Sequence, residues 1–189
     1  MKRGILFLIS GPSGVGKHTL LVNLLKMPEL NLHYSISMTT RKKRENEIDN
    51  KDYYFVTKAY FQEQIAQQKM LEYAQFFDNF YGTPKSKVEE MLNLGKNVIL
   101  EIEVIGAKQV MQLMPDCVSI FILPPSLEEL YKRLVERKTE SLAMIEKRIA
   151  KARDEIELKT MYQYNVINDD LANAEKEIIA IIKKEILAK

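Results

Sequence analysis

The chain has 189 residues, a length that fits one domain or one domain carrying a small insertion. Apolar residues make up 46% and charged residues 29%, which excludes disordered, collagen-like and low-complexity proteins. The net charge of +2 gives no reason to expect a nucleic-acid or membrane partner, and the single cysteine excludes an internal disulfide.

Strands and helices are predicted to alternate along most of the chain. Residues 5–9 are apolar on both faces, as in a strand buried between two helical layers, and a glycine-rich turn then leads into a helix at 19–26. Further strands are predicted at 32–37, 97–103, 117–123 and 165–168, and further helices at 104–113, 127–137, 142–158 and 171–187. This order predicts an α/β fold with a doubly wound, mostly parallel sheet, in which ligands bind at the carboxyl ends of the strands.

Residues 39–90 differ from the rest of the chain. They hold a basic run at 41–44, most of the tyrosines, and strand-like pieces at 53–56 and 70–74. We therefore expect a small mixed α/β insertion at 39–90 within a core made of residues 1–38 and 91–189. No apolar run is long enough to cross a bilayer, so a cytoplasmic protein is expected.

A phosphate-binding loop is predicted directly after the first strand. Residues 11–18 match the P-loop pattern G-x-x-x-x-G-K-[ST] at every fixed place except the last. Glycines let backbone N–H groups surround phosphate oxygens, lysine adds a point charge, and the next helix presents its positive end. The residues expected to bind a triphosphate are Gly11, Pro12, Ser13, Gly14, Val15, Gly16, Lys17, His18 and Thr19.

His18 departs from that pattern, which places a hydroxyl there to ligate Mg²⁺. Mg²⁺ prefers oxygen, whereas imidazole suits softer metals, and Thr19 lies roughly 100° further round the helix. In one interpretation water replaces the missing ligand and catalysis survives; in the other, phosphoryl transfer is lost. We favour the first, because Mg²⁺ keeps several waters and binds through substrate phosphates.

The insertion carries a second group of polar residues. Its arginines suit a phosphate monoester, since guanidinium binds phosphate oxygens in pairs, and Glu72 could accept two hydrogen bonds from guanine. The alternative is a solvated basic face with packed tyrosines and a surface glutamate. The residues concerned are Ser37, Arg41, Arg44, Tyr53, Glu72, Tyr81 and Thr83.

Taken together, these motifs resemble guanylate kinase over nearly the whole chain and in the same order. The resemblance rests on the Gly-Pro-Ser-Gly-Val-Gly-Lys loop and the stretches at 35–44, 52–55, 72–74, 81–84, 101–103 with 106–107, 133–134 and 168–171. It implies an ATP:GMP phosphotransferase that uses Mg²⁺, with a P-loop core, a GMP-binding insertion and a short helical lid at about 136–150. ATP and GMP, or dGMP, are then the partners, with no nucleic acid or membrane, and the chain is a monomer or homodimer.

The resemblance also implies roles for single residues. The GMP phosphate would be held by Ser37, Arg41, Arg44, Tyr53 and Tyr81. The guanine would be read by Glu72, Thr83 and Glu103. Lys17 would grip the ATP phosphates, Asn168 would lie near the adenine, and the catalytic arginines would be Arg41, Arg137 and Arg148.

Two departures leave alternatives open. Glu101 and Glu103 stand where the family commonly has Asp; one is expected to be structural and one functional, and Glu101 is a candidate Mg²⁺ ligand beside ATP phosphates and water. His18 leaves open a weakened or inactive binding module. A P-loop kinase for another small phosphorylated substrate is the remaining alternative.

Overall fold

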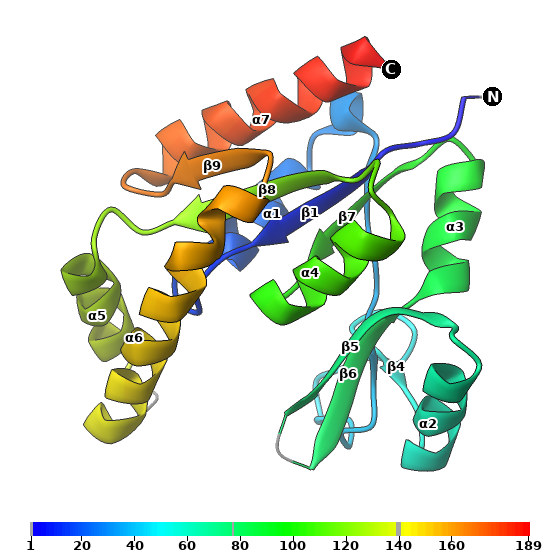
Figure 1. Ribbon diagram of the computed structural model, residues 1–189, viewed down its shortest axis with the longest axis horizontal. Coiled ribbons are helices and arrows are strands. Elements are labelled where there is room, and N and C mark those ends of the chain that lie inside the picture. Colours follow the sequence, from blue (N-terminus) through cyan, green and yellow to red (C-terminus); the bar gives the residue numbers. More distant parts are fainter. Residues whose placement is uncertain (1, 77, 139–140) are drawn as a thin grey trace. The chain divides into compact units, whose positions relative to one another are not determined.

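The computed structural model describes residues 2–76, 78–138 and 141–189 (Figure 1). The chain folds into two compact units. Unit 1 comprises residues 1–6, 33–100 and 105–117, and unit 2 comprises residues 7–32, 101–104 and 118–189. Each unit holds one part of the predicted chemistry, and each is described by itself.

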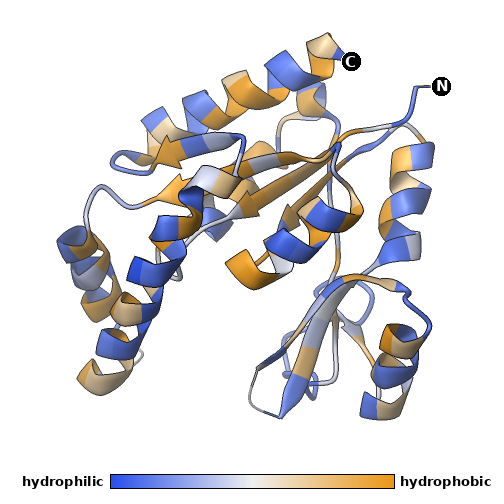
Figure 2. Ribbon diagram, in the orientation of Figure 1, coloured by the Kyte–Doolittle hydropathy of each residue, from blue (hydrophilic) through white to orange (hydrophobic). Residues whose placement is uncertain are grey.

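The larger sheet has five strands in the order β2-β7-β1-β8-β9. Its members are β1 (Leu6–Ser10), β2 (Leu32–Tyr34), β7 (Asn97–Glu101), β8 (Val118–Leu123) and β9 (Tyr164–Ile167). Strand β1 is buried along its whole length and runs parallel to β8, which in turn runs parallel to β9. The predicted α/β fold with a mostly parallel sheet is thus confirmed, and Figure 2 shows how apolar these strands are.

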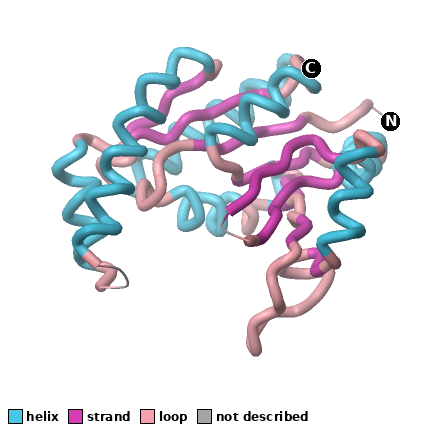
Figure 3. Tube along the Cα trace, turned by 60° about the horizontal axis from the view of Figure 1, so that its bottom comes forward, coloured by secondary structure: helices cyan, strands magenta, loops and turns pink. Residues whose placement is uncertain are grey.

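Unit 2 packs helices around its strands. They are α1 (Lys17–Leu24), α5 (Leu127–Glu136), α6 (Leu142–Glu157) and α7 (Leu171–Ala188). Helix α1 packs against α7, and α5 lies beside α6 in both Figure 1 and Figure 3. Asp170 caps α7 by accepting a hydrogen bond from the Asn173 N–H at 3.0 Å, and Ser126 and Ser141 cap α5 and α6 in the same way.

Unit 1 contains a second, mixed sheet in the order β4-β3-β6-β5. Its strands are β3 (Met38–Thr39), β4 (Tyr54–Phe55), β5 (Met70–Phe76) and β6 (Asn79–Pro84), and its helices are α2 (Lys58–Ala66), α3 (Lys85–Asn93) and α4 (Val104–Leu113). Strands β5 and β6 form an antiparallel hairpin, and Met38, Phe61 and Met70 form the small core beneath it. The strand-and-helix mixture expected for this part of the chain is therefore present.

Two predicted strands are longer than the observed ones. The strand expected at 32–37 ends at Tyr34, and the strand expected at 97–103 ends at Glu101, because residue 104 already begins α4. Two short 3₁₀ turns, Pro28–Leu30 and Leu158–Met161, complete the elements. Among the described residues, no helix is both long and apolar enough to span a membrane.

Candidate functional site

The loop between β1 and α1 has a backbone that glycine alone accommodates well. Gly14 and Gly16 have φ angles of 91° and 101°, in the left-handed region that side chains disfavour. A Cβ on Gly16 would lie 2.5 Å from the Asn168 side-chain nitrogen, and one on Gly11 would lie 2.3 Å from the Ile122 carbonyl oxygen. The close neighbours explain the spacing of these glycines, and the loop delivers the chain to the N-terminus of α1, where N–H groups lack helical acceptors.

Lys17 lies along this loop. Its ammonium donates to the carbonyl oxygens of Gly11 at 2.5 Å and Pro12 at 3.0 Å. Burial lowers the pKa of the Lys17 ammonium, against the opposing effect of Glu101, Glu155 and Glu103. The ammonium is thus held at the loop by backbone oxygens, and its contact with a phosphate stays a prediction.

Two further predicted residues converge on the loop from distant parts of the sequence. Asn168, which is 5% exposed, follows β9 and donates from its side chain to the Val15 carbonyl at 2.7 Å. Arg148 on α6 donates to the Ser13 hydroxyl at 2.6 Å. Asn168 therefore braces the loop from inside unit 2, and its contact with adenine stays a prediction.

Arg137 is placed differently from Arg148. It is the C-cap residue of α5 and is exposed to solvent. It belongs to the predicted lid at about 136–150, of which residues 139–140 lie outside the described part of the chain. Its catalytic role stays a prediction.

His18 and Glu101 form a pair beside the loop. The His18 Nδ1 atom lies 3.3 Å from a Glu101 carboxylate oxygen, and their side chains are 78% and 19% exposed. Thr19 is also exposed on α1. A carboxylate oxygen suits Mg²⁺ and an imidazole nitrogen does not, so of this pair Glu101 fits the ion and His18 does not.

Glu103 takes part in an ion-pair chain that the sequence did not reveal. It accepts a hydrogen bond from Lys151 at 2.8 Å, and Lys151 also lies 3.4 Å from Glu155. Burial raises the pKa of the Glu155 carboxyl. One part of this ion-pair chain could have been predicted from the sequence, because Lys151 and Glu155 have the i,i+4 spacing of an ion pair on the predicted helix at 142–158.

In unit 1, the structure brings Glu72 and Thr83 together. They are directly opposite each other in the β5–β6 hairpin, and the Thr83 hydroxyl donates to Glu72 Oε1 at 2.6 Å. Both are buried, at 7% and 1% exposed. A Cβ on Gly106 of α4 would lie 2.6 Å from Glu72 Oε2, so the absence of a side chain there leaves room for the carboxylate. The third residue predicted to read guanine, Glu103, belongs to unit 2.

Arg41 lies among aromatic rings and a carboxylate. Its guanidinium carbon is 5.5 Å from the centre of the Tyr53 ring and 5.7 Å from that of Phe55. The Tyr53 ring meets the Tyr81 ring edge-on at 6.3 Å. Arg41 also makes a two-point ion pair with Glu47, a residue that sequence reasoning missed. Three of the residues predicted for the GMP phosphate are thus neighbours.

The other two predicted phosphate ligands flank this cluster in the sequence. Ser37 is half-buried just before β3, and its carbonyl accepts from the Tyr54 N–H at 2.9 Å. Arg44 is exposed in the loop between β3 and β4, where its backbone N–H donates to Glu47 at 2.8 Å. These backbone contacts do not test the predicted role of either side chain, so both roles stay predictions.

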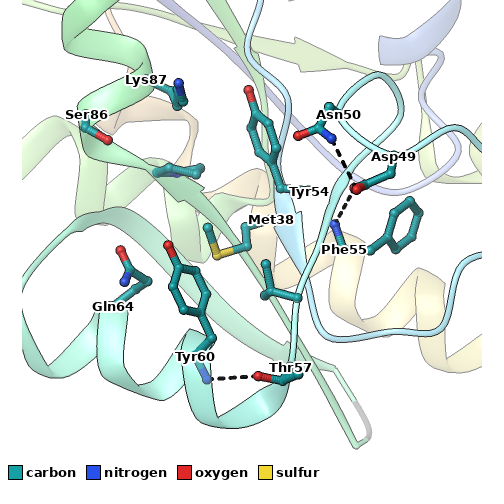
Figure 4. A pocket seen from close by; sticks show the side chains of 12 residues that line it. Met38, Asp49, Asn50, Tyr54, Phe55, Thr57, Tyr60, Gln64, Ser86 and Lys87 are labelled. Atoms are coloured by element: carbon teal, nitrogen blue, oxygen red, sulfur yellow. Dashed lines mark hydrogen bonds between the residues drawn. The ribbon is translucent and has the colours of Figure 1, made fainter.

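The loop between β3 and β4 is held by its own acidic side chains. Asp49 accepts from the Asn50 side chain and the Phe55 N–H, each at 3.1 Å, as Figure 4 shows. Asp52 accepts from the Ile48 N–H at 2.6 Å. Hydrogen bonds within this segment therefore set the shape of the loop.

The pocket drawn in Figure 4 opens beside this loop and is lined by Tyr54 and Lys87 among others, but by none of the predicted nucleotide ligands.

The comparison with known proteins agrees with the motifs. The family model described as guanylate kinase matches residues 3–185. Proteins named guanylate kinase from Latilactobacillus sakei and Lactiplantibacillus plantarum are 50% and 49% identical to the chain; each match covers 97% of it, and 90% and 89% of the relative respectively. The one from Oceanobacillus iheyensis is 48% identical, over 100% of this chain and 91% of its own.

Solved structures give the same picture. The crystal structure of guanylate kinase from Anaplasma phagocytophilum matches with a TM-score of 0.76 and 34% identity, over 97% of this chain and 87% of that one. A shikimate kinase from Bacteroides thetaiotaomicron matches with a TM-score of 0.53 and 14% identity, over 95% and 98% of the two chains. The second match shows a shared fold alone.

Proposed function

Because the chain belongs to the guanylate kinase family, we propose that it transfers the γ-phosphoryl group of ATP to GMP or dGMP, with Mg²⁺. The products are ADP and GDP or dGDP. The family match over residues 3–185 carries this proposal. The glycine loop with Lys17 and the buried Glu72–Thr83 pair support it, since they supply a phosphate cradle and an acceptor for purine N–H groups.

The proposed reaction needs no side-chain nucleophile. An oxygen of the GMP phosphate attacks the γ-phosphorus, and the bond from that phosphorus to the β,γ-bridging oxygen breaks, so that the electron pair leaves with ADP. The transition state spreads negative charge over the transferred oxygens. Lys17 and the loop N–H groups would bind the donor phosphates, while Arg41, Arg137 and Arg148 would stabilise the developing charge.

For Mg²⁺, the residues present fit a site built mainly by the nucleotide. ATP phosphates and water would supply most ligands, and Glu101 is the protein carboxylate that fits as a further one. When bound, the ion would neutralise charge on the β- and γ-phosphates. His18 would stay outside this set.

We propose the arrangement expected for the family: a core of residues 1–38 and 91–189, a GMP-binding insertion at 39–90 and a lid at about 136–150. We also propose that the protein acts in the cytoplasm as a monomer or homodimer, without a nucleic-acid or membrane partner. Light scattering after size-exclusion chromatography distinguishes the two oligomeric states.

A coupled assay of ADP formation with several acceptors tests the function. We expect turnover with GMP and dGMP, little with AMP or ribose bisphosphate, and loss of turnover when EDTA removes Mg²⁺. Lys17→Ala should lower kcat on the order of a hundredfold or more, because it removes the positive charge that stabilises the phosphoryl group during transfer. Lys26→Ala, an exposed lysine beyond the end of α1, serves as the matched control. A folded chain that shows no turnover with GMP contradicts the proposal.

A further inference from the structure

Glu47 holds two parts of the predicted phosphate site with one carboxylate. Its Oε1 accepts from Arg41 Nη2 at 2.7 Å, and its Oε2 accepts from Arg41 Nη1 at 2.9 Å. The same Oε2 also accepts from the Arg44 backbone N–H at 2.8 Å. The Arg41 and Glu47 side chains are 17% and 18% exposed, so the pair is largely shielded from solvent, unlike an ordinary surface ion pair.

These bonds fix the direction of the Arg41 fork. Two parallel N–H···O bonds allow a guanidinium and a carboxylate one mutual orientation in a plane. The rings of Tyr53 and Phe55, at 5.5 and 5.7 Å, restrict the guanidinium further. A long side chain that would otherwise sample many rotamers is therefore held in one.

The oriented Arg41 guanidinium still has N–H groups that these hydrogen bonds do not use. A guanidinium carries five N–H groups, and Glu47 and the Lys42 carbonyl use three of them. Two remain for further acceptors, and Tyr81 lies against the Tyr53 ring that this guanidinium faces. Because Tyr81 is itself a predicted phosphate ligand, the free donor capacity of Arg41 lies beside a second part of the same site.

We propose that Glu47 is a positioning residue for the acceptor phosphate. It orients the Arg41 guanidinium and ties the Arg44 backbone to it, so that the Arg41 side chain and the Arg44 backbone are arranged before GMP binds. This inference rests on the proposed function, because it assigns Arg41 and Arg44 to the GMP phosphate.

Calorimetric titration with GMP and with guanosine tests the inference, since guanosine has the base but lacks the phosphate. For Glu47→Gln we expect the Kd for GMP to rise on the order of tenfold, because a neutral amide accepts weaker bonds than a carboxylate. The Kd values for guanosine and for Mg·ATP should stay within about twofold, as expected for a residue that acts on the phosphate alone.

Glu45→Gln is the matched control, because it removes the same charge from an exposed position in the same loop. Its Kd for GMP should equal or fall slightly below that of the unaltered chain. In an Arg41→Ala background, Glu47→Gln should change the GMP Kd by less than about twofold, because the residue through which it acts is gone.

Three results would overturn the inference. Tighter GMP binding by Glu47→Gln would show that the carboxylate competes with the phosphate for Arg41. Equal weakening of GMP and guanosine would show a general effect on the fold, and an unchanged GMP Kd would show no role. If the unaltered chain itself binds no GMP, the proposed function fails together with the inference, whereas the three results above leave the function intact.

Discussion

Gly106 leaves space for the carboxylate that we expect to recognise guanine. An alanine Cβ at this position would lie 2.6 Å from Glu72 Oε2, well inside van der Waals contact, so the carboxylate would have to move. Because Glu72 is also bonded to Thr83, its displacement should disturb both.

We therefore predict that Gly106→Ala raises the KM for GMP on the order of tenfold or more and leaves the KM for ATP within about twofold. Steady-state kinetics with each substrate varied checks this. Ile105→Ala, a change at the neighbouring residue, which is 61% exposed, should leave both constants unaltered. An unchanged KM for GMP in Gly106→Ala would count against Glu72 as the guanine ligand.

His18 gives a second prediction at the scale of one residue. Its side chain is 78% exposed and contacts Glu101 at 3.3 Å, so replacement removes little packing. Since Mg²⁺ is expected to bind through ATP phosphates and water, His18→Ser should change kcat by less than about threefold. A gain on the order of a hundredfold would instead show that the histidine cripples the site.

At the scale of secondary-structure elements, a hydrogen bond connects the end of β9 to the phosphate loop. Asn168 donates from a buried amide to the Val15 carbonyl, and without it that carbonyl loses its partner. We predict that Asn168→Ala lowers the free energy of unfolding by about 1–3 kcal/mol and weakens ATP binding, because the loop loses a brace. Urea denaturation and ATP titration measure the two effects. Asn165→Ala, an exposed position on β9, should alter neither.

Sequence pattern predicts elements well where each one carries its own signal. The helix expected at 104–113 is α4 with the same bounds, and the buried strands β1 and β8 differ from prediction by no more than one residue at each end. Strand β4 lies within the strand-like piece predicted at 53–56, whereas β3 has two residues, too few for a periodic pattern, and exists because it pairs with β4 and β6. Helix α3, between the hairpin and β7, was not predicted either. Its buried side chains, Val88 and Leu92, are too few to give a clear helical pattern in the sequence.

The site was predictable to the extent that its residues belong to motifs. The loop residues from Gly11 to Lys17 follow from motif spacing, and Glu72 and Thr83 follow from the resemblance to guanylate kinase, whereas the hairpin register that places the pair face to face was not predicted. Glu47 does not, because its contact with Arg41 depends on how an irregular loop turns, and that turn is set by Asp49 and Asp52. A carboxylate near a basic run carries no sign of which cation it meets.

Stability at low pH is a property of the whole molecule to which Glu47 contributes. Its bonds to Arg41 and to the Arg44 N–H lower the pKa of the Glu47 carboxyl from 4.5 to about 2. Because this pKa is lower in the folded chain than in the unfolded chain, the ionised carboxylate stabilises the fold at pH values above about 4.5. That stabilisation is lost as the pH falls from about 4.5 to about 2. Urea denaturation should find Glu47→Gln less stable than the unaltered chain at pH 7, with a smaller difference at pH 3. A difference that does not depend on pH would contradict the ion pair.

Taken as a whole, the molecule is expected to pass a phosphoryl group directly from one nucleotide to another. Incubation with [γ-³²P]ATP, Mg²⁺ and GMP, followed by chromatographic separation of the products, tests that expectation most directly. We predict that the label leaves ATP and appears in GDP. Label recovered as inorganic phosphate, or retained in ATP while the chain remains folded, would contradict direct transfer.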